Sequence, residues 1–295
     1  MKRFLLTLLA IIFVASCAQG EGKSLPINLD PLTPAPEEYF ISDHEYKDET
    51  LHVLIEEKEY LGAIAHVAWV TVKDPSQLRT GLSSTKKNIL SSYPRMRTTT
   101  EMAQRTGGAV IAINGDFFAS ENRSAGYIVR MGELMREKDT HARDSLLVDD
   151  QGNFHLLVSP TKADRVAITD AYHIVNAFSF GPAMIIDGAL VDIRDDYKFA
   201  SFEPNPRTAI GQIGELQYVM IVVDGRSKES VGLTILDLQQ FMLELGCQQA
   251  FALDGGGTAT MTFHMQTYSN PSDREERPLS DIIYFASGLS ESIPQ

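Results

Sequence analysis

The chain has 295 residues, of which 43% are hydrophobic and 22% charged, and its formal net charge at neutral pH is −13. This length allows one large domain or two small ones, and the composition is ordinary for a globular protein. The acidic balance argues against non-specific binding to nucleic acid or to anionic lipid, so no nucleic-acid partner is expected.

The first 16 residues have the pattern of a secretory signal. Two basic residues precede an apolar run at positions 4–14, and two small residues follow it. The run is too short to span a membrane as a mature anchor. The tetrad Val14-Ala15-Ser16-Cys17 resembles the bacterial lipoprotein box, in which the cysteine is lipidated. We expect residues 1–16 to be a lipoprotein signal peptide and Cys17 to carry the lipid; ordinary signal cleavage near the same position is the alternative.

A lipidated Cys17 would anchor the protein to a membrane of the bacterial cell envelope. No aspartate follows Cys17 directly, which in Gram-negative lipoproteins is consistent with sorting to the outer membrane. Residues 17–50 are rich in Pro, Glu, Asp and Gly and are expected to form a tether or an extended strap. A single catalytic domain is then expected over residues 51–295.

The second cysteine, Cys247, has no partner for an intramolecular disulfide if Cys17 carries lipid. It precedes a predicted strand and is expected to be a small buried hydrophobic residue. The seven histidines are scattered without the close spacing of zinc ligands, so a histidine zinc site is not expected.

The remaining elements follow from hydrophobic periodicity and from turn residues. A helix over residues 234–245 is the clearest, because Ile235, Leu238, Met242 and Leu245 share one face, Thr234 can cap it and a glycine stands where it ends. Many strands and few helices predict an α+β fold, with a mixed β-sheet core flanked by a few helices. The expected elements are strands at 62–72, 109–113 and 218–223, a hairpin of 146–148 with 154–158, a strand at 250–253, and helices at 98–105 and 234–245.

Four polar elements follow or interrupt the apolar strands. They are Asn114-Gly115-Asp116, the segment 205–211 with Arg207, Asp224-Gly225-Arg226, and the segment 254–258. Each can be an ordinary turn. Strand ends are also where rigid scaffolds place functional groups, so we expect Asn114, Asp224 and Asp254 to meet in one cleft, joined by Arg207.

The most informative of these is Leu253-Asp254-Gly255-Gly256-Gly257-Thr258. An apolar strand delivers one carboxylate directly into three glycines, whose backbone can adopt positive φ and admit close neighbours. A carboxylate beside exposed amides and a hydroxyl suits a polar, often anionic ligand. Arginines elsewhere can bind phosphate in a bidentate manner, and carboxylates can perform acid–base chemistry.

The order of these motifs resembles the phosphodiester glycosidase family, which includes the enzyme that uncovers mannose 6-phosphate by removing N-acetylglucosamine. The resemblance covers about residues 60 to 286. Asp116 lies at a position that varies among relatives, and Thr258 stands where the family commonly has Ser, which keeps the hydroxyl. The matching pieces are 113–118, 181–188, 206–211, 223–226, 232–261 and the Arg-Pro element at 277–281.

The resemblance implies hydrolysis of a sugar-1-phosphodiester, similar to that of N-acetylglucosamine, with release of a sugar and a phosphomonoester. Asp254 is the first candidate for base, nucleophile or metal ligand, and Arg207 for binding phosphate. Asn114 and the amides around Gly255 and Gly256 could orient sugar or phosphate oxygens. Asp224 and Arg226 could instead pair with each other. The catalytic candidates are Asp254, Arg207, Asn114 and Asp116, and the substrate-binding candidates are Gly115, Asp224, Arg226, Gly255, Gly256, Thr258 and Arg277.

A metal ion is the one cofactor considered, because aspartate side chains could hold a hard cation such as Ca²⁺ or Mg²⁺. Two other functions fit the same residues. The protein could be a non-enzymatic lipoprotein that binds surface polysaccharide, or a conventional glycosidase that uses two carboxylates as paired acid and base. Asp116, Asp224 and Asp254 are the candidates for such a pair.

Overall fold

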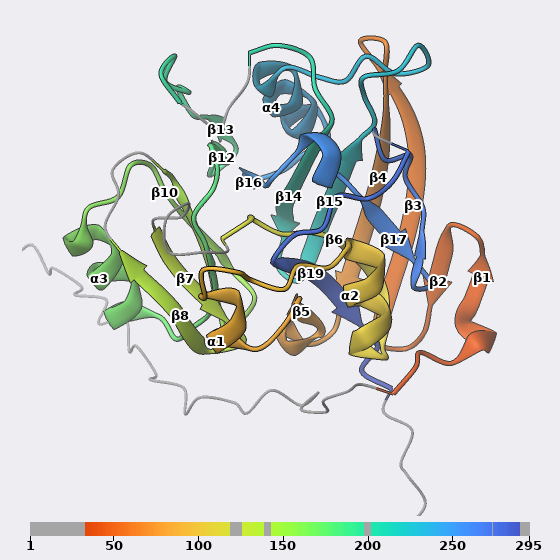
Figure 1. Ribbon diagram of the computed structural model, residues 1–295, viewed down its shortest axis with the longest axis horizontal. Helices are drawn as coiled ribbons and strands as arrows, with labels where there is room; N and C mark the ends of the chain where they lie inside the picture. The colour runs from red at the N-terminus through yellow and green to blue at the C-terminus, as the bar shows by residue number, and fades with distance from the viewer. Residues whose placement is uncertain (1–32, 119–125, 139–142, 198–201, 273, 290–295) are drawn as a thin grey trace, which may run out of the picture.

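The computed structural model describes residues 33–118, 126–138, 143–197, 202–272 and 274–289, and these form three β-sheets with four helices (Figure 1). The expected strand-rich core with few helices is confirmed. The expected mixed sheet is wrong, because every strand pair of the described residues is antiparallel. Many sequential neighbours are joined by hairpins, and antiparallel strands need no crossover helix.

The largest sheet has nine strands and carries three of the four polar elements at the ends of its strands. β14 begins within the segment 205–211, and β15 ends at the segment 224–226. β16, which pairs with β14, leads into Asp254 and the three glycines. In spatial order the strands are β1 (Phe40–Ser42), β2 (Glu45–Lys47), β3 (Leu51–Tyr60), β4 (Ala63–Val72), β15 (Gln217–Val223), β14 (Arg207–Gly214), β16 (Gln249–Ala252), β12 (Ala183–Ile186) and β13 (Ala189–Leu190).

Two five-stranded sheets complete the β structure. One has the order β18 (Gln266–Thr267), β17 (Met261–Phe263), β6 (Ala109–Asn114), β19 (Asp281–Ala286) and β5 (Leu78–Leu82). The other has the order β10 (Phe154–Leu157), β9 (Ser145–Asp149), β11 (Ile174–Phe178), β7 (Gly126–Arg130) and β8 (Glu133–Lys138). The helices are α1 (Lys86–Ile89), α2 (Thr99–Thr106), α3 (Lys162–Ala171) and α4 (Ile235–Glu244), with 3₁₀ turns at Glu37–Tyr39, Pro75–Gln77 and Gly256–Thr258.

β15 shows why the centre of the large sheet is apolar on both faces. Successive side chains of a strand point to opposite faces. Met220 and Val222 belong to the core cluster that also contains residues of β6, β17 and β19, whereas Val219 and Ile221 belong to the cluster formed with α4. The sheet is therefore covered on both sides, and the continuous apolar run predicted at 218–223 is the consequence.

The two predicted helices are confirmed to within one residue. Thr98 caps α2 and Thr234 caps α4, each in a capping box with the acidic residue three positions later. Gly107 ends α2 in the left-handed region, at a φ of 76°. α4 packs on the large sheet through its buried apolar face, as its periodicity predicted.

The folded domain includes residues that lie N-terminal to the expected boundary at residue 51. β2 pairs with β3, and Tyr46 is fully buried in the main core. Its hydroxyl donates to Asp48 at 2.6 Å. The segment 40–47 is thus part of the large sheet rather than of a tether.

Cys247 is buried as predicted, and burial raises the pKa of its thiol to about 12. None of the described helices is long and apolar enough to cross a membrane. Cys17 and the expected signal peptide lie outside the described residues.

Candidate active site

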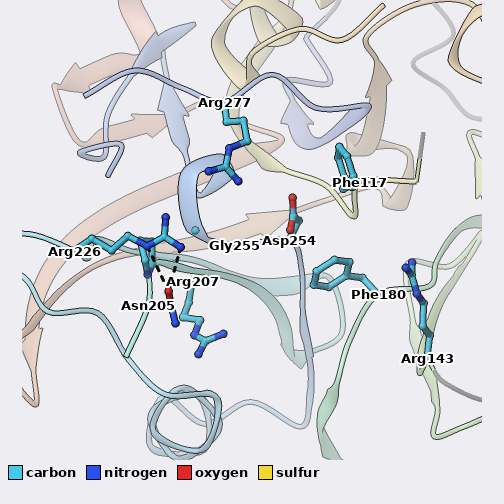
Figure 2. Close-up of a pocket in the computed structure, with 11 residues that line it drawn as sticks. Phe117, Arg143, Phe180, Asn205, Arg207, Arg226, Asp254, Gly255 and Arg277 are labelled. Atoms are coloured by element: carbon cyan, nitrogen blue, oxygen red, sulfur yellow. Dashed lines mark hydrogen bonds between the residues drawn. The ribbon is translucent and has the colours of Figure 1, made fainter. Parts of the chain in front are cut away.

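A pocket of about 620 Å³ opens where β14 begins and where the chain leaves β16 (Figure 2). Four arginines and one aspartate line it, together with two phenylalanines and the glycine turn. Among the described lining residues, one carboxylate stands among four guanidinium groups, and this positive charge suits an anionic ligand. Its lining residues are Phe117, Arg143, Phe180, Asn205, Pro206, Arg207, Arg226, Asp254, Gly255, Gly256 and Arg277.

Asp254 is the carboxylate of this pocket. Burial raises its pKa to about 6, and nearby Asp116 adds to that rise. Hydrogen bonds from the Thr258 hydroxyl, at 2.9 Å, and from the Gly255 amide oppose the rise, as does the charge of Arg277. Asp254 is therefore poised to change protonation close to neutral pH, as groups in acid–base chemistry often are.

The glycine turn at residues 255–257 lets other groups lie close to its backbone. The sequence predicted that the amides of Gly255 and Gly256 would bind a ligand, but they have partners within the protein. The amide of Gly255 donates to the carboxylate of Asp254, and the amide of Gly256 donates to the carbonyl oxygen of Pro206 at 2.9 Å. Both amides thus already have acceptors within the protein. The prediction that they orient substrate oxygens gains no support from this geometry.

Gly256 instead provides the surface against which Arg226 lies. Its φ is 66°, and a Cβ at this position would stand 3.0 Å from Nη2 of Arg226. The Arg226 guanidinium also donates to Oδ1 of Asn205, at 3.2 Å from Nη2. A glycine is required here both for the backbone conformation and for the arginine above it.

Arg207 lines the same pocket as Asp254 but is partly used in holding the backbone. Its Nε donates to the carbonyl oxygen of Leu233 at 2.8 Å, and Nη2 donates to that of Glu203 at 3.0 Å. Burial and the neighbouring Arg226 lower its pKa to about 10. In Figure 2 its guanidinium points away from Asp254, while those of Arg226 and Arg277 lie to one side of it.

Asn114 is fully buried and does not line the pocket. Its side-chain amide donates to the carbonyl oxygen of Asp254 at 2.6 Å, and its oxygen accepts from the Thr208 hydroxyl at 2.7 Å and the Thr260 amide at 3.2 Å. Asn114 therefore joins β6 and β14 to the loop that carries Asp254. The two motifs are therefore in contact, but Asn114 binds the backbone carbonyl oxygen of Asp254 and not its carboxylate.

Gly115 and Asp116 do not line the pocket either. The carbonyl oxygen of Gly115 accepts from the amide of Asp254 at 3.3 Å. Asp116 is fully buried, and its two oxygens accept from Arg130 Nη2 at 2.7 Å and from the amide of Ser179 at 2.9 Å. Arg130 also pairs with Asp281 at 2.7 Å. Asp116 is thus a member of a buried ion-pair cluster and does not line the pocket.

Asp224 is likewise placed away from the pocket lining. Its Oδ2 lies 2.9 Å from Nε2 of His66 and accepts from the side-chain amide of Asn270 at 2.7 Å, while Oδ1 accepts from the Asn270 amide at 3.0 Å. These contacts fix the segment that leads to Arg277. The alternative pairing of Asp224 with Arg226 does not occur, because each has other partners.

The structure thus brings together only some of the predicted residues. Asp254, Arg207, Arg226, Gly255, Gly256 and Arg277 line the pocket, whereas Asn114, Gly115, Asp116 and Thr258 hold the loops around it and Asp224 holds a neighbouring segment. Sequence reasoning assigned no role to Phe117, Arg143, Phe180 or Asn205. Phe117 and Asn205 stand inside motifs already singled out and Phe180 stands directly before one, so proximity to those motifs was the available signal for all but Arg143.

Metal binding is not favoured by the residues of this pocket. Among the described residues no group of three or more histidine, cysteine, aspartate and glutamate side chains is placed to hold a metal ion. A hard cation prefers several oxygen ligands. In the described part of the lining, one carboxylate surrounded by arginines does not fit Ca²⁺ or Mg²⁺.

Comparison with known proteins shows which family and which relatives this chain is similar to. The phosphodiester glycosidase family matches residues 107–286, which is more than half of the chain. Uncharacterized protein YomE of Bacillus subtilis is 30% identical over 190 residues, covering 63% of this chain and 29% of that protein. The bovine N-acetylglucosamine-1-phosphodiester alpha-N-acetylglucosaminidase is 26% identical over 192 residues, covering 61% of this chain and 36% of that enzyme. The chain thus matches about a third of the length of these relatives.

Two solved structures share the fold. The catalytic domain of the zebrafish N-acetylglucosamine-1-phosphodiester alpha-N-acetylglucosaminidase superposes with a TM-score of 0.65 at 16% identity, over 91% of this chain and 99% of that one. A hypothetical protein from Synechocystis superposes with a TM-score of 0.63 at 13% identity, over 84% of this chain and 64% of that one.

Proposed function

The chain belongs to the phosphodiester glycosidase family, and we propose from this membership that it hydrolyses a sugar-1-phosphodiester, releasing a sugar and a phosphomonoester. The observation that carries the proposal is the composition of the pocket. Among the described residues that line the pocket, Asp254 is the one carboxylate, and it faces the guanidinium groups of Arg226 and Arg277, which define what we call the arginine wall.

This composition matches the demands of a glycosyl phosphate. A plain glycoside needs one carboxyl group to protonate its leaving oxygen and a second to act as base or nucleophile. A phosphomonoester leaves without full protonation, because its second pKa is about 6. One carboxylate together with cations that accept the phosphate charge is then sufficient.

Asp254 acts in its ionised form. As a base it would remove a proton from water, whose oxygen attacks C1 of the sugar. As a nucleophile it would attack C1 itself and later release the sugar to water. In both cases the C1–O bond breaks, and its electron pair leaves on the phosphate oxygen, where the arginine wall balances the charge.

The other pocket arginines have secondary parts. Arg207 holds the backbone at 203 and 233 and adds positive charge to the pocket lining. Arg143 adds a second buried cation, whose pKa is lowered by burial. The reaction needs no metal ion in this scheme.

The substrate we propose is a phosphodiester of N-acetylglucosamine or a similar sugar, in the bacterial cell envelope. The sugar is proposed by analogy with the bovine and zebrafish relatives, which are N-acetylglucosamine-1-phosphodiester alpha-N-acetylglucosaminidases. The location follows from the lipoprotein box at Cys17.

Two alternatives differ in what they require. A conventional glycosidase needs a second carboxylate near Asp254, yet Asp116 and Asp224 are both engaged in buried contacts. A protein that only binds polysaccharide would bind the substrate without cleaving it.

The test is hydrolysis of a panel of sugar-1-phosphodiesters beside the matching plain glycosides, with and without chelator. We expect cleavage of phosphodiesters only, unaffected by chelator, and ¹⁸O from labelled water in the released sugar. Cleavage of plain glycosides alone would support the two-carboxylate enzyme, and glycan binding without any cleavage would support the binding protein. The anomer released first separates the two roles of Asp254, because a base inverts the centre and a nucleophile retains it.

A further inference from the structure

The pocket has a second wall of different chemistry, on the other side of Asp254 from the arginine wall. Phe117 and Phe180 form this aromatic wall, and Asp254 lies between the two walls (Figure 2). Phe117 follows the end of β6 and Phe180 lies between β11 and β12. Two remote segments of the chain therefore each contribute one aromatic ring.

Phe117 has a backbone conformation that phenylalanine rarely adopts, with a φ of 41°. Its neighbours hold it there. Asp116 before it is fixed by Arg130 and Ser179, and the amide of Phe118 after it donates to the Ser280 hydroxyl at 3.0 Å. A strained residue held in place by its neighbours is more often found at functional sites than elsewhere.

Phe180 is held from both sides as well. The amide of Ser179 before it donates to Asp116 at 2.9 Å, and its own carbonyl oxygen accepts from the Tyr197 hydroxyl at 2.6 Å. Gly181 after it has a φ of 77°, and a Cβ there would stand 2.4 Å from that hydroxyl. Phe180 belongs to the main core and is only 8% exposed, so a ligand can contact only the small part of its ring that lines the pocket.

Asp116 connects these two segments. It is the residue before Phe117, and one of its oxygens binds the residue before Phe180. Its other oxygen binds Arg130, whose guanidinium is stacked over Phe178, with Cζ 4.0 Å from the ring centroid. The buried ion pair thus sets the position of both rings of the aromatic wall, although it does not touch the pocket.

We propose that the aromatic wall is the sugar subsite of the pocket, that the arginine wall is the phosphate subsite, and that Asp116 is a positioning residue for the sugar subsite. This rests on the proposed function. The sugar class is a pyranose with an apolar C–H face, which packs against the electron-rich face of an aromatic ring. Its C1 then lies beside Asp254, and the C1–O bond points toward Arg226 and Arg277.

The test measures the affinities for the two halves of the substrate separately, so it needs no turnover. The probes are N-acetylglucosamine and methyl phosphate, with binding followed by NMR on the full chain. Phe117→Leu and Phe180→Leu should each weaken binding of N-acetylglucosamine about tenfold and leave methyl phosphate within about twofold. Arg226→Lys should weaken binding of methyl phosphate about tenfold and leave the affinity for N-acetylglucosamine within about twofold. Tyr93→Leu, at an aromatic residue that is 91% exposed, is the control and should change neither affinity.

Asp116→Asn keeps an oxygen for Ser179 but removes the charge paired with Arg130. It should raise KM for a sugar phosphodiester more than it lowers kcat and leave the affinity for methyl phosphate unchanged, which a general loss of structure would not do. Unchanged sugar affinity in both phenylalanine variants would overturn the inference even if the wild type hydrolyses phosphodiesters. Equal losses for both probes in those variants, with the fold intact by circular dichroism, would also overturn it. A sugar-specific loss without any hydrolysis would keep the inference and remove the proposed function.

Discussion

The side-chain amide of Asn114 donates a 2.6 Å hydrogen bond to the backbone carbonyl oxygen of Asp254. Asn114 ends β6 in one sheet, and Asp254 follows β16 in another. The contact fixes the backbone of the carboxylate, while Thr258 fixes its side chain. The position of the reacting group therefore depends on a residue that the substrate does not reach.

Removal of this support should cost stability as well as activity. Asn114→Ala leaves the carbonyl oxygen of Asp254 and the amide of Thr260 without their side-chain partner. Each buried group that loses its partner costs about 1–3 kcal/mol, so the free energy of unfolding should fall by at least about 2 kcal/mol. Urea denaturation measures this. A change below about 0.5 kcal/mol, the usual range for a surface substitution, would show that Asn114 does not support the loop.

Activity should depend on pH through Asp254. Its pKa is raised to about 6, so about a tenth of the carboxyl groups are ionised at pH 5 and about nine tenths at pH 7. If the ionised form reacts, kcat/KM should rise with pH across this range and level off above it. A rate that falls through pH 6 would mean that Asp254 acts as an acid, contrary to the mechanism proposed here.

The position of Arg226 should depend on Gly256. Gly256→Ala places a Cβ 3.0 Å from Nη2 of Arg226 at a φ of 66°, so the guanidinium must move. We expect KM for the phosphodiester to rise about tenfold, and Arg226→Lys to have a similar effect through loss of the two-pronged contact.

Gly132→Ala is the matched control, since its φ is 77° and a Cβ there meets nothing within 4 Å. It should affect stability but not KM. Because Gly256 and Arg226 act together, Gly256→Ala should add little in an Arg226→Lys background. Fully additive effects would argue against the contact.

The lipoprotein box predicts that Cys17 anchors the protein. Cys17→Ser should block processing or shift the protein from the membrane fraction to the soluble fraction. Fractionation followed by mass spectrometry of the N-terminus measures this. A wild-type mature protein that is soluble, with an unmodified N-terminus, would contradict the prediction.

Local patterns were sufficient for the elements of the fold. The continuous apolar run at 218–223 and the capped periodicity of 234–245 each depend on neighbours within a few residues, and both were predicted correctly. The antiparallel pairing of β16 with β14 and with β12 depends on residues far apart in the chain. No local pattern carries that information, and the mixed sheet was predicted in its place.

The candidate site shows the same difference between what local patterns predict and what depends on residues far apart in the chain. The glycines after Asp254 correctly predicted close approach to the backbone, but not that Arg226 is the group that approaches. Asp116 and Asp224 have the chemistry of catalytic groups, yet their partners, such as Ser179 and Asn270, stand tens of residues away in the sequence. Whether a carboxylate faces the pocket or the interior is decided by those partners.

The central claim is that the charge of Asp254 drives cleavage of a sugar phosphodiester, and the turnover of Asp254→Asn tests it most directly. The measurement is kcat on an aryl phosphodiester of N-acetylglucosamine, with Asp170→Asn, at an exposed aspartate of α3, as the matched control. We predict that Asp254→Asn lowers kcat by at least about 100-fold, while the control keeps wild-type turnover. Full activity in Asp254→Asn would contradict the mechanism.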